Sequence, residues 1–232
     1  MYTGAVIYIL GLLARSGHGK TTVARHLVDT FGAEIRSLAA PMKRAVQQVF
    51  GFTEAQLWGT QAEKEAIDPR YGFSPRWLLQ RLGTEGLRLE FGEDVHLHAL
   101  LHGLRREAAE VTVDVDGGDR AGAAARLTVV DDVRFPNDAR FIAAGGPDHR
   151  GAVLKIVTTD VPAPAHSGHA SEKAIDEVAA EHIAATVVCS RAQGIEFMLG
   201  QVSRALATAP GFEPLRAVLR ARPDPARTDP AR

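Results

Sequence analysis

The residues most clearly arranged for chemistry lie in "ARSGHGKTT", residues 14–22, between an apolar run and an amphipathic stretch. A phosphate-binding loop needs glycines that let backbone N–H groups converge on an anion, and a following helix whose positive end points to the same place. The stretch ends in Gly19-Lys20-Thr21, as a P-loop does, although Ala14 stands where that pattern has its first glycine. We therefore expect this segment to bind the phosphates of a nucleotide.

The side chains at the end of the loop indicate the kind of nucleotide. In a P-loop the lysine reaches the β- and γ-phosphates of a triphosphate, and the next hydroxyl ligates Mg²⁺. Lys20 and Thr21 occupy those positions. The alternative is a glycine-rich turn with Lys20 in solvent, and the position between an apolar strand and a helix argues against it. The residues expected to bind the nucleotide are Ser16, Gly17, His18, Gly19, Lys20, Thr21 and Thr22.

A second group of charged residues follows the apolar run "LTVV", residues 127–130. A P-loop protein needs a carboxylate there to hold the Mg²⁺ shell. Because neighbouring side chains on a regular strand point to opposite faces, only one carboxylate can face the site; we assign Asp132, with Asp131 as the alternative. Arg134 is placed to neutralise phosphoryl charge. A strand-end turn with solvated carboxylates and a surface arginine are the simpler interpretations. The predicted catalytic residues are Lys20, Asp132 and Arg134, and the predicted metal ligands are Thr21 and Asp132.

These groups can meet only if the fold brings strand ends and helix starts together. Apolar, β-branched runs predict strands, and apolar residues at helical spacing, bounded by proline or glycine, predict helices. The strands are expected near 5–13, as a short strand from residue 35, and near 127–130, 152–157 and 184–189. The helices are expected near 20–31, 41–51, 74–92, 94–109, from 136 onward, and at 195–207. The expected fold class is α/β: a P-loop NTPase with a doubly wound parallel sheet flanked by helices.

The amino-acid composition excludes several classes of protein. The 232 residues are 45% apolar and 24% charged, with a net charge of −1, which argues against a chain that mainly coats nucleic acid. A single cysteine, Cys189, can form no internal disulfide and favours a cytoplasmic setting. No apolar run reaches the length of about 18 residues that a spanning helix needs, and the run 5–14 predicts a buried strand, not a secretion signal. We expect a cytoplasmic protein with no membrane partner.

Other nucleotide-binding classes fit less well. A GTPase of the common type reads guanine with Asn-Lys-x-Asp, and the single asparagine, Asn137, lies in "FPNDA". No LSGGQ-like segment of a transporter ATPase occurs, and the chain is too short for a helicase-like second domain. Small-molecule kinases are therefore the favoured class.

Four further stretches resemble the phage-type deoxynucleoside monophosphate kinases. "DVRFPND", residues 132–138, is similar to the family's Asp-Val-Arg-Phe-Pro-Asn-Glu element, with Asp138 in place of the glutamate. "APMKRAVQQVFGFT" (40–53) resembles its Pro-Leu-Lys helix that ends at Phe-Gly. "LLQRLGTEGLR" (78–88) and "HASEKAID" (169–176) resemble its Leu-Leu-Gln-x-Leu-Gly-Thr-Glu and His-x-Ser-Glu segments, and all four occur in the family's order.

The resemblance implies both a fold and a reaction. The fold is that of adenylate-kinase-like P-loop kinases, with helical acceptor-binding and lid insertions. The reaction transfers the γ-phosphoryl group of ATP, with Mg²⁺, to a deoxynucleoside monophosphate. Two departures accompany it: the family's loop usually reads Arg-Ser-Gly-Lys-Asp-Thr, whereas this one inserts His18-Gly19, and "VHLHAL" (95–100) stands where relatives often have a tryptophan. The second departure bears on the acceptor pocket.

The resemblance also implies which residues face the acceptor. Two polyanions must be brought together, so cationic side chains are needed beyond the P-loop lysine. The candidates are Arg15, Lys43, Arg44, Arg81, Glu85, Arg88 and Glu172. Spacing alone also allows Arg81, Glu85 and Arg88 to form surface ion pairs on a helix, and Glu172 to belong to an ordinary helix start.

The expected organisation is one kinase domain over 1–209. An acceptor-binding helical region is expected near 40–110, and the Gly/Asp/Ala-rich segment near 114–126 is expected to be a mobile loop. Pro, Ala and Arg dominate 210–232, which predicts a disordered tail. Whether the protein forms a homodimer is left open.

Two rival functions are also left open. A related P-loop kinase that phosphorylates hydroxymethylpyrimidine bases in phage DNA would need a basic, partly aromatic groove. Near-zero net charge and 6% aromatic residues disfavour it, whereas the arginine-rich tail keeps DNA in consideration as a partner. A nucleotide-binding regulator without turnover is disfavoured by the intact set of Lys20, Thr21 and Asp132. The favoured function is the nucleotide kinase, in the host cytoplasm if phage-encoded.

Overall fold

The structure, a computed structural model, describes residues 6–113, 126–161 and 173–219. The chain separates into two compact units. One, called the sheet unit below, comprises Met1–Arg36 and Gly103–Arg232; the other, the helical unit, is Ser37–His102. No helix among the described residues is long and apolar enough to cross a membrane.

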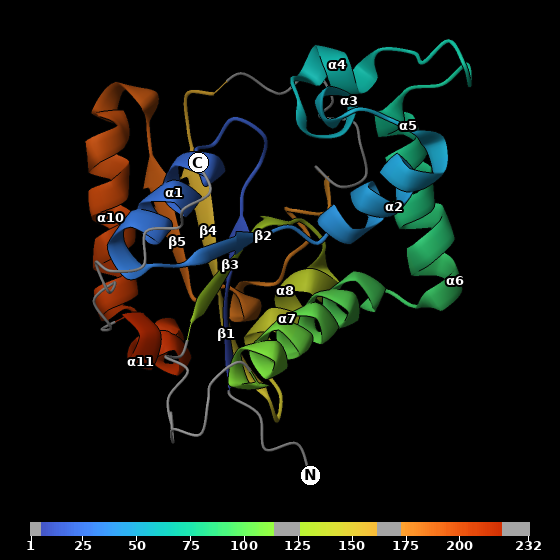
Figure 1. Cartoon of the computed structure of the whole chain (residues 1–232). Coiled ribbons are helices and arrows are strands. Elements are labelled where there is room, and N and C mark those ends of the chain that lie inside the picture. The colour runs from blue at the N-terminus through green and yellow to red at the C-terminus, as the bar shows by residue number, and fades with distance from the viewer. Residues whose placement is uncertain (1–5, 114–125, 162–172, 220–232) are drawn as a thin grey trace. The chain divides into compact units, whose positions relative to one another are not determined.

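A five-stranded parallel sheet forms the centre of the sheet unit (Figure 1). The strand order is β2-β3-β1-β4-β5, so the first strand lies in the middle and the chain winds outward to both sides. The strands are β1 (Ile7–Leu13), β2 (Glu34–Arg36), β3 (Leu127–Val133), β4 (His149–Thr158) and β5 (Ala185–Cys189), and every neighbouring pair is parallel. The predicted α/β class with a doubly wound parallel sheet is confirmed, and the fold is P-loop NTPase-like.

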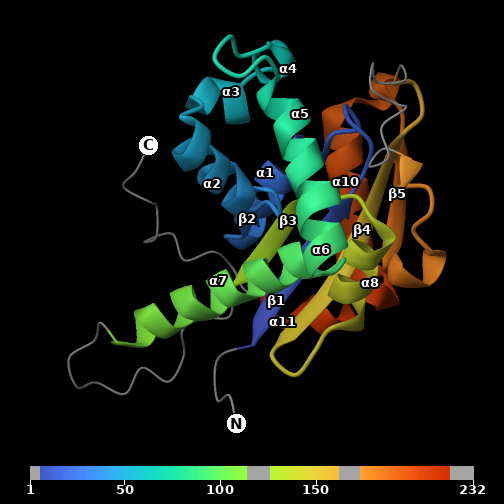
Figure 2. The same ribbon diagram turned by 90° about the vertical axis from the view of Figure 1, so that its right-hand side faces the viewer.

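Helices cover both faces of this sheet, as the apolar strands of a parallel sheet require. They are α1 (Lys20–Phe31), α8 (Pro136–Ala144), α10 (Gly194–Thr208) and α11 (Arg216–Leu219), with the 3₁₀ turns η2 (Ala180–His182), η3 (Arg191–Gln193) and η4 (Pro210–Leu215). Alternation along β1 places Leu10 and Leu12 in the apolar cluster with α1 and α10, whereas Gly11 lies against Ile142 of α8. Figure 2 shows α8 on one side of the sheet and α10 on the other.

The predicted disorder of the C-terminal segment is wrong for residues 210–219. This stretch forms η4 and α11, and Phe212 and Leu215 are fully buried in the apolar cluster of the sheet unit. Val218 is buried as well, so three apolar side chains at helical spacing outweigh the Pro/Arg-rich composition. Residues 220–232, and residues 114–125 of the mobile loop predicted near 114–126, lie outside the described residues.

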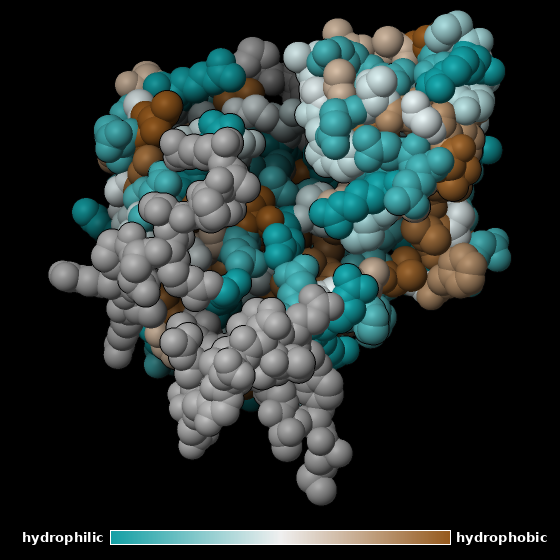
Figure 3. Space-filling view, viewed as in Figure 1, coloured by the Kyte–Doolittle hydropathy of each residue, from teal (hydrophilic) through white to brown (hydrophobic). Residues whose placement is uncertain are grey.

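The helical unit has an apolar core of its own, formed by Val46, Phe52, Leu57 and Leu78. Its elements are α2 (Ala40–Phe50), α3 (Glu54–Trp58), α4 (Gln61–Glu65), α5 (Pro75–Gln80), the π-helix η1 (Arg81–Arg88), α6 (Leu89–Phe91) and the start of α7 (Val95–Val113), which continues into the sheet unit. Figure 3 shows hydrophilic and hydrophobic residues mixed over the surface of this unit. A role in binding the acceptor stays a prediction for the range 40–110.

One predicted helix is not a regular α-helix along its whole length. The pattern of 74–92 predicts a single helix, and the Ser74 hydroxyl does cap its first turn by accepting a backbone N–H. The chain then widens into a π-helix over Arg81–Arg88. Gly83 within it is buried, and a Cβ added there would lie 3.1 Å from Cε of Met42. Short π-helical segments are frequent at functional sites, so Arg81–Arg88 is a candidate functional segment of the helical unit.

Candidate phosphate-binding site

The loop between β1 and α1 has a backbone that depends on its glycines. Gly17 and Gly19 have φ angles of 80° and 89°, a region that residues with a side chain rarely adopt. Gly19 is the N-cap residue of α1, so the helix begins at Lys20. The first N–H groups of α1 and the positive end of its dipole are therefore directed at the loop. This is the geometry by which a helix N-terminus binds phosphate.

Lys20 folds back over the loop. Its Nζ donates hydrogen bonds to the carbonyl oxygens of Ala14 and Arg15, the latter at 3.3 Å. The side chain is half-buried, so it is not the solvated lysine of the simpler interpretation. The ammonium charge is held at the loop itself. Contact between Lys20 and a phosphate stays a prediction.

The other loop residues that were predicted to bind the nucleotide differ in exposure. Ser16 and Thr21 are exposed, and Thr22 is half-buried. The ring of His18 faces the end of β4, where the backbone N–H of Thr158 donates to its Nδ1 at 3.0 Å. That ring nitrogen is therefore engaged by protein, and a contribution of His18 to phosphate binding would come from its backbone.

Asp131 and Asp132 lie on β3, beside the strand that leads into the loop. In the pairing of β1 with β3, Leu13 is opposite Val133, and a register shift places both aspartates opposite Leu12. Such a bulge breaks the regular alternation of side chains, and both aspartates are half-buried. The argument that only one of them can face the site assumed a regular strand, so it does not decide between them on this irregular one. The choice between the two carboxylates stays open.

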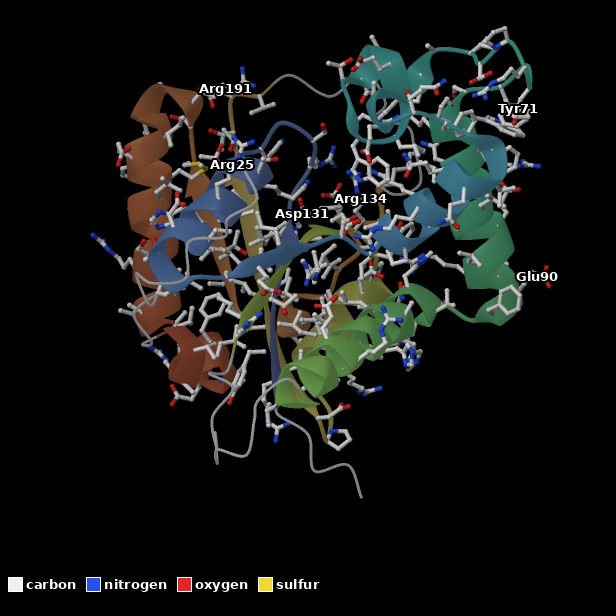
Figure 4. The ribbon with its side chains drawn as sticks, in the orientation of Figure 1. Arg25, Tyr71, Glu90, Asp131, Arg134 and Arg191 are labelled. Atoms are coloured by element: carbon white, nitrogen blue, oxygen red, sulfur yellow. The ribbon has the colours of Figure 1, made fainter. Side chains whose placement is uncertain are left out.

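The carboxylates and the loop share one edge of the sheet. β1 ends at Leu13 and the loop begins at Ala14, while β3 ends one residue after Asp132. Because parallel strands end at the same edge, the two features come together without any contribution from the helical unit. Figure 4 shows Asp131 and Arg134 at this edge.

Sequence reasoning missed the role of Asp138, which it noted only as a replacement for glutamate. Asp138 is 1% exposed, and its Oδ2 accepts the backbone N–H groups of Arg134 at 3.3 Å and Phe135 at 3.1 Å. It thereby fixes the turn between β3 and α8, which begins at Pro136 as predicted. An acid at the third helical position after a cap is a recognisable signal, so this role could have been predicted.

Sequence reasoning also missed a partner of Arg15. The Arg15 guanidinium forms an ion pair with Asp176, which lies in the "HASEKAID" stretch, far along the chain. The two side chains are 33% and 58% exposed. No spacing in the sequence indicates this pair, because the residues are brought together only by the fold.

Three predicted acceptor residues lie on the π-helix of the helical unit. Arg81 and Glu85 form an ion pair at 3.0 Å, with side chains 56% and 52% exposed, which is the surface pair that their spacing alone allows. Nη1 of Arg88 donates to the carbonyl oxygen of Glu93 at 3.0 Å. Their proposed contact with an acceptor stays a prediction.

Two further predicted acceptor residues lie on α2 of the helical unit. Nζ of Lys43 is 5.5 Å from the centroid of the Trp58 ring, a cation–π distance, and Arg44 is exposed. The last candidate, Glu172, lies outside the described residues.

The donor set at the sheet edge suits magnesium. The described residues contain no cluster of three or more His, Cys, Asp or Glu side chains that could hold a metal ion. A Mg²⁺ ion that arrives with a nucleotide needs no such cluster, because it keeps several waters and is held by phosphates and one or two carboxylates. The Thr21 hydroxyl and the carboxylates of Asp131 and Asp132 are hard oxygen donors of the kind Mg²⁺ prefers.

A Gly-Lys-Thr loop between the central strand and the first helix, with carboxylates on the neighbouring strand, defines a P-loop NTPase-like α/β protein. No protein-family model matches the chain. The chain is 33% identical over 153 residues to a protein of Acanthamoeba polyphaga mimivirus with the provisional name deoxynucleotide monophosphate kinase, and the match covers 64% of this chain and 72% of that protein. The chain therefore belongs to the same kinase-like family as the mimivirus protein.

A crystal structure of a sugar kinase from a Janibacter species is also similar. The identity is 16%, the TM-score is 0.37, and the match covers 89% of this chain and 98% of that one.

Proposed function

We propose that the protein is an ATP- and Mg²⁺-dependent deoxynucleoside monophosphate kinase that converts a dNMP to a dNDP. The observation that carries this proposal is the Gly-Lys-Thr loop beside two strand-end carboxylates at one edge of the sheet. The family relationship to a viral protein named for this reaction supports the acceptor class. A phage-type enzyme acting in the host cytoplasm belongs to the same proposal.

In this reaction an oxygen of the acceptor monophosphate attacks the γ-phosphorus of ATP. The bond from that phosphorus to the β,γ-bridging oxygen breaks, and ADP leaves with the bond's electron pair. The protein contributes positioning and charge neutralisation. Lys20 and the N–H groups at the start of α1 would hold the β- and γ-phosphates, and the Thr21 hydroxyl with Asp131 or Asp132 would hold Mg²⁺. Bound Mg²⁺ supplies charge neutralisation at the phosphate oxygens.

Arg134 is the second predicted cation for the transferring group, besides Lys20. It follows the carboxylates by two residues, and its backbone N–H donates to the buried carboxylate of Asp138. A guanidinium on a fixed turn loses less freedom when it meets a phosphoryl group than one on a loose loop would. Its predicted role therefore depends on Asp138 as well as on its own charge.

Arg15 is the predicted acceptor-side residue within the loop. Its ion pair with Asp176 is solvent-accessible, and exposed pairs of this kind contribute about 0–1 kcal/mol. An acceptor phosphate can therefore exchange with the Asp176 carboxylate at small cost, which keeps Arg15 available for substrate.

One observation favours the rival that acts on bases in DNA. Aromatic rings gather in the helical unit, where Tyr71 stacks on Phe73 at 5.6 Å between centroids and Phe73 lies 5.2 Å from Trp77. The guanidinium of Arg81 is 5.5 Å from the Trp77 ring, and Trp77 is 48% exposed. Stacking platforms beside cations suit single-stranded nucleic acid, so DNA is tested as an acceptor alongside the mononucleotides.

The test measures ADP release from Mg²⁺–ATP with a panel of four dNMPs and, separately, with hydroxymethylpyrimidine-containing DNA. We expect turnover with at least one dNMP. Lys20→Ala should lower kcat by about a hundredfold or more, because the charge that stabilises the transferring group is removed. Arg204→Ala, which removes an exposed cation of α10 in the sheet unit, is the control and should keep the wild-type rate.

Turnover on DNA alone would replace the proposed acceptor by the rival one. Nucleotide binding without turnover on any acceptor would favour the regulator. A Lys20→Ala variant with the full rate would contradict the assignment of the chemistry to this loop.

A further inference from the structure

His18 of the phosphate-binding loop is hydrogen-bonded to Thr158, the last residue of the neighbouring strand β4. We infer that His18 is a positioning residue which, through Thr158, holds the phosphate loop in the conformation that binds ATP. This inference rests on the proposed function, since it assigns a task within the same site. It also gives a physical reason for the His18-Gly19 insertion in this loop.

Two hydrogen bonds join His18 to Thr158. The backbone N–H of Thr158 donates to Nδ1 of the His18 ring at 3.0 Å, and the Thr158 hydroxyl donates to the His18 carbonyl oxygen at 3.4 Å. A ring nitrogen that accepts a hydrogen bond carries no proton, so the contact requires the imidazole to carry its proton on Nε2. The contact thus holds both the side chain and the backbone of the loop residue.

The end of β4 is itself well anchored. Thr158 is buried, with 8% of its surface exposed, and the N–H of Thr159 donates to the carbonyl oxygen of Cys189 at 2.9 Å. Asp160 accepts the backbone N–H groups of Arg191 and Ala192; the hydrogen bond from Arg191 is the main reason that the pKa of Asp160 lies below its usual value. The two hydrogen bonds between His18 and Thr158, called the clamp below, therefore tie the loop to a well-anchored part of the sheet.

The remaining contacts of the loop leave it little room to shift. A Cβ added to Gly19 would lie 2.8 Å from Sδ of Met198 on α10, and one added to Gly17 would lie 3.4 Å from Cγ1 of Val161. The loop thus packs against the end of β4 and against α10, and His18 adds hydrogen bonds to this packing. Its backbone N–H groups can converge on a phosphate only if that position is kept.

The expected consequence is a loss of ATP affinity with little loss of chemistry. His18→Ala removes the ring acceptor and leaves the buried Thr158 N–H without it, so the Kd and the KM for ATP should rise about five- to tenfold. The kcat at saturating ATP should stay within about twofold of wild type, because the charged residues of the site are unchanged. Melting temperature serves to show that each variant is folded.

Two substitutions separate positioning from general packing. In His18→Asn the carboxamide oxygen lies as many bonds from the backbone as Nδ1 does, so it can accept the Thr158 N–H and should restore wild-type affinity. In His18→Gln the oxygen lies one bond further out and should not. Thr158→Val removes the second hydrogen bond while keeping the branched shape, and should weaken ATP binding less than His18→Ala does.

A spectroscopic readout tests the contact without substrate. A long-range proton–nitrogen NMR spectrum of the wild-type protein should show His18 as the tautomer with its proton on Nε2 and with Nδ1 accepting a hydrogen bond. A His18 ring protonated on Nδ1 would overturn the inference.

The binding results distinguish the two proposals. Lys20-dependent ATP binding that is unchanged in His18→Ala, or lost equally in His18→Ala and His18→Asn, overturns the clamp and leaves the kinase proposal intact. A wild-type protein that binds no ATP overturns both. A loss in His18→Ala that His18→Asn restores supports the clamp.

Discussion

Asp138 is almost completely buried, with 1% of its surface exposed, although it is an ionisable residue. Its carboxylate accepts the N–H groups of Arg134 and Phe135 and so determines how the strand turns into α8. The position of Arg134, a predicted catalytic cation, therefore depends on the conformation of this turn. The proposed site therefore also depends on side chains that do not themselves bind phosphate.

Asp138→Ala should lower both stability and catalysis. The loss of an acceptor for two N–H groups at a helix start should reduce the free energy of unfolding by about 1–2 kcal/mol. The kcat should fall more than the KM for ATP rises, because Arg134 loses its fixed backbone while the loop is untouched. Urea unfolding and steady-state kinetics measure the two effects.

Asp138→Asn keeps one oxygen acceptor and should be less affected than Asp138→Ala. Asp29→Ala, at an exposed position of α1, is the control and should change neither quantity. A fully active Asp138→Ala variant would show that the turn does not position Arg134.

Among the secondary-structure elements, the connection between α4 and α5 is held in place by hydrogen bonds to one buried carboxylate. Asp68 is 3% exposed, and it accepts hydrogen bonds from the Arg70 guanidinium, from the Arg70 N–H and from Gln56. The hydrogen bonds from Arg70, followed by that from Gln56, hold the pKa of Asp68 far below its usual value. The ionised form is thus the form that the native helical unit favours.

This shift predicts how stability depends on pH. A carboxyl group whose pKa is lower in the folded chain adds stability above its unfolded pKa, and that stability is lost as the pH falls. The urea midpoint of the wild type should therefore drop between pH about 5 and about 2. Asp68→Asn should be less stable at neutral pH and should show a shallower drop.

Asp29→Asn, which changes an exposed carboxylate, should keep the wild-type pH dependence. If Asp68→Asn retained the same slope as this control, Asp68 would not be the group responsible.

The C-terminal element η4 should contribute strongly to the sheet unit. Phe212 is fully buried in the main apolar cluster, so Phe212→Ala should reduce the free energy of unfolding by about 3–5 kcal/mol. Glu213→Ala removes a neighbouring side chain that is 75% exposed and should cost at most about 1 kcal/mol. Equal stabilities of the two variants in urea unfolding would mean that η4 does not pack on the core.

At the scale of the whole molecule, local patterns predicted most of the elements. Apolar runs gave the positions of the strands, and Gly32 and Gly51 end α1 and α2 in the left-handed conformation that glycine favours. Proline starts α5 and α8 as predicted. Signals of this kind lie within a few residues of the structure that they specify, and a single sequence is enough to read them.

Features that depend on pairing between distant segments could not be predicted in this way. The bulge at Asp131 and Asp132 exists only in the register of β3 against β1. The partners of Arg15 and His18, Asp176 and Thr158, are separated from them by more than a hundred positions. The ordered structure of residues 210–219 was not predicted, because their Pro- and Arg-rich composition is typical of disorder and masks the apolar spacing of Phe212, Leu215 and Val218.

We propose that the loop ending at Lys20 and the carboxylates of Asp131 and Asp132 flank a single Mg²⁺–triphosphate. The most direct test of this arrangement is calorimetric titration of ATP with and without Mg²⁺, into the wild type, Lys20→Ala and Asp131→Asn/Asp132→Asn. We expect Lys20→Ala to weaken ATP binding in both conditions, whereas the aspartate variant should lose only the gain in affinity that Mg²⁺ provides. ATP binding that is indifferent to Lys20, or a Mg²⁺ effect that survives without both aspartates, would contradict it.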